Sequence, residues 1–231
     1  MGEMNWSQLL RPELAEFSAY VPVAGNFPVR LDANEAPSLM SDDARRRMTE
    51  VVAGIAWERY PDASYEALRA ALADYSGVSP QEILAGVGSD ELISILLTSL
   101  ARPRGRDQVP SLVTTTPSFV MYRMTGRLRG TRVVEVPLGP AWELPLASMK
   151  TAVEMASPNI LFIASPNNPT GNLMAPDALA ELIEAAPSSL VIVDEAYVPY
   201  AERNQLELYR RYPNVAILRT LSKVGFASLR V

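Results

Sequence analysis

Short apolar runs alternate with longer helical patterns along this chain, and the alternation limits the fold more than any other feature of the sequence. The apolar, branched runs cover residues 83–85, 111–115, 132–136, 160–164, 190–193 and 215–219. Helical patterns cover residues 42–54, 64–76, 90–101, 118–126, 146–156, 176–186 and 204–212. Nearly all-apolar strands separated by helices are typical of a mostly parallel sheet covered on both faces. The sequence therefore predicts an α/β fold.

Two segments carry the signals of a helix start. Ser79-Pro80-Gln81-Glu82 has the pattern of a capping box with proline at the first helical position. Pro176-Asp177 begins another predicted helix in the same manner. Both signals support the prediction that helical turns begin at these positions.

The composition excludes several kinds of chemistry. The chain has 231 residues, enough to bury a core, and contains neither cysteine nor histidine. Disulfides, thiolate nucleophiles, Ser-His dyads and ordinary zinc sites are thereby excluded, and we predict no metal site. Only Lys150 and Lys223 are lysines, and the remaining basic residues are arginines, which form no imines at neutral pH. Lys150 lies in an amphipathic run and is expected to be a solvated helix lysine, so Lys223 is the candidate for amine chemistry.

The charge pattern indicates neither a nucleic-acid nor a membrane partner. The formal net charge is −5, and the short basic cluster at 102–106 is broken by proline and glycine, as expected for a solvated loop. No apolar run approaches the roughly 18 residues that span a bilayer, and the first twenty residues lack a basic start followed by an apolar block. We therefore expect a cytoplasmic location.

Unusual residues follow three of the predicted strands. Residues 165–171 read Ser-Pro-Asn-Asn-Pro-Thr-Gly, residues 194–197 read Asp-Glu-Ala-Tyr, and Lys223 follows the last strand. The separations from Asn168 to Asp194 and from Asp194 to Lys223 are 26 and 29 residues, about one strand-helix-strand unit each. Ligands of such sheets bind at the carboxyl ends of the strands. An amide, a carboxylate, a phenol and an amine are thus expected to converge on one crevice.

Each of these residues also has a plainer interpretation. Asn168 stands in a sequence that favours turns, and Asp194 is suited to capping the next segment. Tyr197 suits packing beside the sheet, and Lys223 suits a solvated loop. Their conjunction favours a site, because an acid delivered to the end of an apolar strand usually has a cationic partner.

A glycine turn at residues 86–88 precedes the predicted helix at 90–101. Glycine permits a tight turn, and a helix start offers free N–H groups to a phosphate. Asp90 and Glu91 fit a second interpretation, in which they only complement the helix dipole.

A lysine, a buried acid, hydrogen-bond donors and a helix-terminal phosphate cup are what pyridoxal phosphate requires. The segments at 31–37, 59–62, 88–91, 165–171, 193–197 and 219–223 resemble, in order, those of the histidinol-phosphate aminotransferase family, within the fold-type-I superfamily. The resemblance runs from about Tyr20 to Val231.

The resemblance implies a role for each matching residue. Lys223 would hold the cofactor as an imine and move the proton of the substrate α-carbon. Asp194 would pair with the protonated ring nitrogen, and Asn168 and Tyr197 would hydrogen-bond the ring oxygen. Phe119 would stack on the ring; from spacing alone, it is equally a core aromatic at a helix start. The residues expected at the phosphate are Ser89, Asp90, Thr220, Ser222 and Arg230. Tyr60 would reach the cofactor phosphate of a neighbouring subunit, which implies a homodimer.

The family also implies a domain plan. We expect residues 1–40 to form an N-terminal arm with part of a small domain, and residues 41–231 to form an incomplete pyridoxal-phosphate-binding large domain. Family members continue past the position of Val231 into a small domain that carries an arginine for the substrate carboxylate. We therefore expect this chain to be a fragment that lacks the C-terminal small domain and leaves a sheet edge exposed.

The reaction implied is amino transfer between L-histidinol phosphate and 2-oxoglutarate, with L-glutamate as the partner product. Threonine-phosphate decarboxylases and aromatic or branched-chain transaminases share the fold and cofactor set, so they stay open as alternatives. A non-catalytic remnant that keeps only the cofactor cup or a dimer surface is the alternative from another class.

Overall fold

The computed structural model describes residues 9–12, 14, 17, 24–29, 31–37, 40–104 and 108–231. Most of the first twenty residues, Tyr20 and Arg106 of the basic cluster lie outside the described residues, as does much of the expected arm at 1–40. None of the described helices is both long and apolar enough to cross a membrane.

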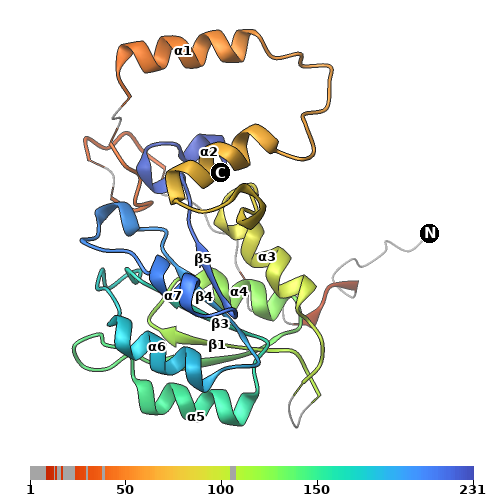
Figure 1. Cartoon of the computed structure of the whole chain (residues 1–231), viewed down its shortest axis with the longest axis vertical. Coiled ribbons are helices and arrows are strands. Elements are labelled where there is room, and N and C mark those ends of the chain that lie inside the picture. The colour runs from red at the N-terminus through yellow and green to blue at the C-terminus, as the bar shows by residue number, and fades with distance from the viewer. Residues whose placement is uncertain are drawn as a thin grey trace.

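Five parallel strands form one sheet in the order β2-β1-β3-β4-β5 (Figure 1). The strands are β1 (Ser111–Thr116), β2 (Arg132–Pro137), β3 (Ile160–Ala164), β4 (Leu190–Asp194) and β5 (Val215–Leu218). The helices are α1 (Asp42–Ala53), α2 (Glu66–Ser76), α3 (Ser89–Ser99), α4 (Val120–Leu128), α5 (Leu146–Ala156), α6 (Pro176–Ala185) and α7 (Leu206–Arg211). The predicted α/β class and parallel sheet are confirmed, and five of the six predicted strands form.

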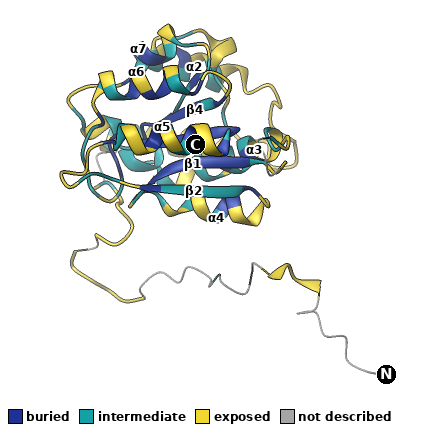
Figure 2. Cartoon of the chain, turned by 90° about the horizontal axis from the view of Figure 1, so that it is seen from below, coloured by how far each residue is buried: buried dark blue, intermediate teal, exposed yellow. Residues whose placement is uncertain are grey.

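Alternate residues of each strand feed two separate cores. Leu161 and Ile163 of β3 pack toward α5 and α6, whereas Ile160 and Phe162 pack toward α3 and α4. Strands β3 and β4 are buried on both sides, and the helices that pack on the sheet, such as α5 and α6, expose their outer faces (Figure 2). This two-sided burial is why the strands are apolar without a polar alternation.

The predicted strand at 83–85 is wrong. The capping-box segment forms only a single 3-10 turn, Pro80–Glu82, in which the Ser79 N–H donates to Glu82 Oε2 at 2.8 Å. Residues 83–86 that follow have no regular structure and pair with no described strand. They face β5 across an apolar cavity of about 260 Å³, whose walls include Ile83, Leu92 and Ala216. An apolar run becomes a strand only when another strand accepts its backbone hydrogen bonds, and here none does.

The expectation of an exposed sheet edge agrees with the position of β5. Among the described residues β5 pairs with β4 alone, so it forms one edge of the sheet. The chain end at Val231 returns to the same cavity, close to Leu72 and Tyr75 of α2.

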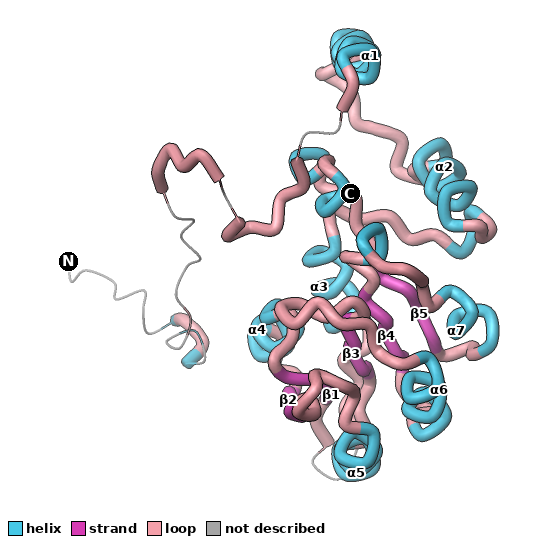
Figure 3. The backbone as a smooth tube through the Cα atoms, turned by 90° about the vertical axis from the view of Figure 1, so that its left-hand side faces the viewer, coloured by secondary structure: helices cyan, strands magenta, loops and turns pink. Residues whose placement is uncertain are grey.

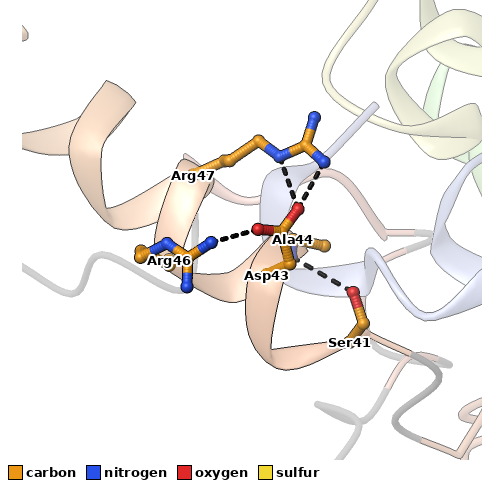
Figure 4. Close-up of polar contacts among 5 residues, drawn as sticks. All are labelled: Ser41, Asp43, Ala44, Arg46 and Arg47. Carbon is orange, nitrogen blue, oxygen red and sulfur yellow. Dashed lines mark hydrogen bonds and ion pairs between the residues drawn. The ribbon is translucent and has the colours of Figure 1, made fainter.

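Helix α1 stands apart from the sheet (Figure 3) and buries none of its residues. Its stability is local. The Ser41 hydroxyl accepts a hydrogen bond from the Ala44 N–H at 3.2 Å, and Asp43 pairs with Arg46 and Arg47 (Figure 4). These are an N-cap and two ion pairs between residues three and four positions apart.

The basic segment at 102–104 is a loop, as expected, although it is not fully solvated. The Arg104 guanidinium donates to the carbonyl oxygens of Ser188 at 2.5 Å and Pro158 at 3.3 Å. These contacts attach the loop to the amino ends of neighbouring strands.

Candidate active site

Strand β4 delivers Asp194 to the carboxyl edge of the sheet. Because strand side chains alternate, Asp194 lies on the same face as Ile192, toward α3 and α4. Its side chain is buried, with 4% of the residue exposed. Burial raises the pKa of this carboxyl from its usual 3.8 to about 6. The strand thus places a costly group where only specific partners can stabilise it.

Two donors hold the Asp194 carboxylate, one on each oxygen. The Tyr122 hydroxyl donates to Oδ2 at 2.5 Å, and the Ala196 N–H donates to Oδ1 at 2.9 Å. Tyr122 was not predicted as a site residue. Its position three residues after Phe119 places both rings on the same side of a helix, which is the signal that would have found it.

Phe119 reaches the same region through Tyr122. It caps the start of α4, and its ring centroid lies 5.6 Å from that of Tyr122 in an edge-to-face arrangement. The structure therefore brings Phe119 beside Tyr122, the residue that donates to Asp194.

The loop at 165–171 follows β3 and forms hydrogen bonds with the end of β4 and with the residues after β1. The Ser165 N–H donates to the Asp194 carbonyl at 2.8 Å, and the Ser118 hydroxyl donates to Asn167 Oδ1 at 2.9 Å. Asn168 lines an open cavity of about 410 Å³ together with Tyr197 and Asn34. The amide and phenol predicted to act together thus border one space.

Lys223 follows β5, on a 3-10 turn that covers Ser222–Val224. Its Nζ atom lies 5.6 Å from the centroid of the Tyr197 ring and donates to the Ala33 carbonyl at 3.1 Å. Asn34 Nδ2 donates to the Tyr197 hydroxyl at 2.9 Å. The amine, the phenol and the segment at 33–34 are therefore in contact.

Lys150 has no part in this region. Its Nζ atom pairs with Glu181 Oε2 at 2.9 Å, between the outer faces of α5 and α6. The expectation of a surface helix lysine is confirmed.

A polar cup surrounds the start of α3. Gly88 caps the helix with φ +78, and a β-carbon built there would lie 2.7 Å from Arg230 Nη2, so the guanidinium packs against the glycine backbone. Ser89 and Asp90 are the first two residues of the helix. Asp90 Oδ1 is buried without a hydrogen-bond partner among the described residues.

The turn after β5 carries two hydroxyl groups, one of which contacts the C-terminal segment. The Thr220 hydroxyl lies 3.1 Å from that of Ser222 and donates to the Val231 carbonyl at 3.1 Å. The Ser222 N–H donates to the Thr220 hydroxyl at 3.2 Å. This turn binds the carbonyl of Val231, the residue directly after Arg230. The turn and the Arg230 guanidinium therefore belong to one structural unit.

A second buried acid lies next to Asp194. Glu195 is fully buried, and its Oε2 accepts two hydrogen bonds from Arg219, at 2.9 Å from Nε and 2.7 Å from Nη2. Its Oε1 accepts the Gln205 N–H. The pair joins the ends of β4 and β5 to the start of α7. Glu195 and Arg219 were not predicted as site residues, although they lie within the motifs at 193–197 and 219–223.

Tyr60 is not brought to the other predicted residues. It lies on the connection between α1 and α2 and is 100% exposed. No contact within the described residues draws it toward Lys223 or Asp194.

Comparisons with known proteins identify the family to which this chain is similar. The model of the family "Aminotransferase class I and II" matches residues 28–231. A histidinol-phosphate aminotransferase of Chromobacterium violaceum is 38% identical over 230 residues, which are 99% of this chain and 63% of the relative. One of Thermococcus gammatolerans is 36% identical over 93% of this chain and 60% of its own length.

Solved structures show the same fold. The histidinol-phosphate aminotransferase of Sinorhizobium meliloti, determined in complex with pyridoxal 5'-phosphate, superposes with a TM-score of 0.74 and 28% identity over 86% of this chain and 53% of that one. The α-aminoadipate aminotransferase LysN of Thermus thermophilus reaches a TM-score of 0.75 at 24% identity, over 98% of this chain and 61% of that one.

This chain spans about 60% of the length of the curated relatives that it matches. The part that it does span carries the parallel sheet, the buried carboxylate at the end of β4 and the lysine after β5. With a family model that matches from residue 28 to the last residue, the chain belongs to the aminotransferase class I and II family.

Proposed function

We propose that this chain is the pyridoxal-phosphate-binding part of an enzyme that transfers the amino group of L-histidinol phosphate to 2-oxoglutarate, with L-glutamate as the second product. The curated relatives named above are histidinol-phosphate aminotransferases. The observation that carries the proposal is the Asp194 carboxylate, which is buried at the carboxyl edge of the sheet and accepts two hydrogen bonds. Lys223 lies on the turn that follows the neighbouring strand β5.

The residues present fit pyridoxal phosphate. Arg230 packs against Gly88 at the start of α3, where a permanently charged fork and free N–H groups suit a phosphate. Asp194 offers negative charge to a cationic ring nitrogen. Asn168 and Tyr197 border one cavity with donors for a ring oxygen.

When bound, pyridoxal phosphate withdraws electrons from the substrate α-carbon and so makes its proton acidic. Lys223 Nζ, which here donates to the Ala33 carbonyl, would be the amine that holds the cofactor and would accept and return the α-proton. Asp194 would face the ring nitrogen with its charge, and Tyr197 and Asn168 would donate to the ring oxygen. Phe119 would pack against the ring, and Arg230 with Ser89, Asp90, Thr220 and Ser222 would hold the phosphate.

A homodimer is part of the proposal. Helix α1 buries nothing, and the segment that follows it exposes Ile55, Trp57 and Tyr60. Apolar side chains gathered on an arm suit a partner surface. In the second copy, Tyr60 would then contact the phosphate cup of its neighbour.

The two lysines give a matched test of the cofactor site. Pyridoxal phosphate added to the purified chain is expected to give a protein-bound imine absorbance band. Borohydride should reduce the imine to a secondary amine, which removes this band and leaves the cofactor as a covalent adduct. Lys223→Ala should abolish the adduct, whereas Lys150→Ala, at the surface pair with Glu181, should leave it unchanged. Equal labelling of both variants, or none in the folded parent, would reject the cofactor site.

Substrate choice separates the proposed reaction from its alternatives. Histidinol phosphate should convert the bound cofactor to its amine form, and phosphothreonine should not. Release of carbon dioxide from phosphothreonine would identify the decarboxylase activity instead. A folded chain that binds the cofactor and responds to neither compound would support a non-catalytic remnant.

A further inference from the structure

We propose that Tyr122 is a positioning residue that fixes the orientation of the Asp194 carboxylate and keeps it ionised for the cofactor ring. The cofactor part of this inference rests on the proposed function. The part that concerns the carboxylate rests on contacts within the chain, so the two can be tested separately.

Packing around the Tyr122 ring fixes the direction of its hydroxyl group. Tyr122 is fully buried, and its ring stacks on Phe162 with centroids 4.8 Å apart and an interplanar angle of 8°. Phe119 meets the ring edge-on from a second direction. A ring held between two aromatics cannot swing, and its hydroxyl meets Asp194 Oδ2 at 2.5 Å.

The carboxylate is equally constrained. Its other oxygen accepts the Ala196 N–H at 2.9 Å, two residues further along the chain. Each oxygen therefore has its own donor, one from a side chain 72 residues away and one from the local backbone. Rotation of the carboxylate would break both hydrogen bonds.

The surrounding charges explain why the hydroxyl is needed. Desolvation by burial is the main effect that raises the Asp194 pKa, and the charges of Asp90 and Glu195 act in the same direction. The hydrogen bonds from Tyr122 and Ala196 oppose them. Glu195 is itself paired with Arg219. The Ala196 donor is a backbone group, so Tyr122 supplies the only side-chain hydrogen bond to this carboxylate among the described residues.

Tyr122 is suited to permanent donation. Burial, followed by the charge of Asp194, raises the pKa of its phenol well above 10. The hydroxyl therefore keeps its proton over the whole working range of pH. It acts as a fixed donor and takes no part as an acid or base.

Tyr122→Phe tests the inference directly, because it removes the hydroxyl and keeps the ring stacked on Phe162. Carboxyl-carbon NMR of aspartate-labelled chain, without cofactor, would follow the titration of Asp194, assigned by its loss in Asp194→Asn. We expect a midpoint near 6 in the parent. In Tyr122→Phe we expect it to rise by about one pH unit, the size of one lost hydrogen bond to a charged group.

Tyr212→Phe is the matched control, since that hydroxyl also donates to a carboxylate, Glu184 Oε1, at 2.5 Å on the surface. It should leave the Asp194 midpoint unchanged. An unchanged midpoint in Tyr122→Phe would overturn the inference. If that variant does not fold, difluorotyrosine at position 122 replaces it. This more acidic donor should lower the midpoint, and a constant midpoint would overturn the inference just the same.

Cofactor binding then separates the two proposals. If the titration shifts and Tyr122→Phe also weakens pyridoxal phosphate binding by about tenfold, the positioning role is supported. If the titration shifts but the parent takes no cofactor, the proposed function fails while the hold on the carboxylate stands. If the parent and Tyr122→Phe bind cofactor equally and with identical spectra, the positioning role fails and the proposed function stands.

Discussion

Helix α1 and the carboxyl edge of the sheet are held by opposite kinds of interaction. The N-cap of α1 and the ion pairs of Asp43 join residues at most four positions apart, and no residue of the helix is buried. At the sheet edge, Asp194 and Glu195 are buried and depend on partners 72 and 24 residues away. The helix thus relies on local interactions, whereas the polar contacts of the sheet edge form only when distant segments pack together.

Breaking an ion pair in each region should give the largest difference between them. Arg219→Leu leaves the Glu195 charge buried without its partner, and we expect a loss of about 3–5 kcal/mol in the free energy of unfolding. Arg47→Leu breaks a pair with Asp43 on exposed α1 and should cost only about 0.3–0.5 kcal/mol. Urea denaturation measures both. Adding Glu195→Gln to Arg219→Leu should recover much of the lost free energy of unfolding. A loss under about 1 kcal/mol for Arg219→Leu alone would contradict the expected difference between the sheet edge and α1.

The pH dependence of stability should also originate at the sheet edge. Because the Asp194 pKa is raised from 3.8 to about 6, the folded chain binds more protons than the unfolded chain between these values. The free energy of unfolding should therefore fall by roughly 3 kcal/mol as pH rises across this window, and then level off.

Two exposed acids act in the opposite sense at lower pH. A hydrogen bond from Ser64 lowers the pKa of Asp62, and one from Tyr209 lowers that of Glu82. The difference between the parent and Asp194→Asn isolates the Asp194 contribution from theirs. Parallel stability curves for the two proteins would show that Asp194 does not titrate in this window.

Two glycines with positive φ, Gly88 and Gly171, allow a matched comparison within the sheet-edge region. Gly88→Ala forces a residue with a β-carbon into φ +78, ψ 168, at a cost of order 1–3 kcal/mol, and displaces the Arg230 guanidinium. Gly171→Ala has a similar φ of +75 but meets nothing within 4 Å. Both variants should be destabilised in thermal unfolding, and only Gly88→Ala should also lose the stabilisation that added phosphate gives. Equal phosphate effects would separate Arg230 from the cup.

The N-cap of α1 should give an effect confined to that helix. Ser41→Ala removes the N-cap hydrogen bond to Ala44 and should cost about 1 kcal/mol of helix stability. Hydrogen exchange of α1 amides should accelerate while exchange in β3 and β4 stays the same. Ser41→Asp supplies another capping oxygen and should restore protection. Faster exchange throughout the sheet would show that α1 is coupled to the core after all.

Local sequence signals predicted the elements well and their partners poorly. All seven predicted helices form, because amphipathic spacing and proline starts act within a few residues. The run at 83–85 has the apolar character of a strand, but strand formation depends on a neighbour that local sequence does not specify. The position of α1 relative to the sheet had no local signal either.

The site divides along the same line. Asp194, Lys223 and Arg230 follow strands or turns whose topology the sequence predicts, and the structure places them at one sheet edge and its cup. Tyr122 was missed because its role depends on a contact 72 residues away, and the Glu195–Arg219 pair because two long side chains met across neighbouring strands. The roles assigned to the cofactor-binding residues stay predictions.

The edge position of β5 affects how any measurement of assembly must be designed. Its outward backbone groups border an apolar cavity, and an unpaired strand of this kind is a template for joining another chain. Sedimentation of the parent at high concentration would then combine two associations, one through the arm that carries Trp57 and one through β5. Trp57→Ala removes an exposed side chain of the arm and should weaken only the first. Comparing the sedimentation of that variant with the parent at several concentrations separates the proposed homodimer from association through β5.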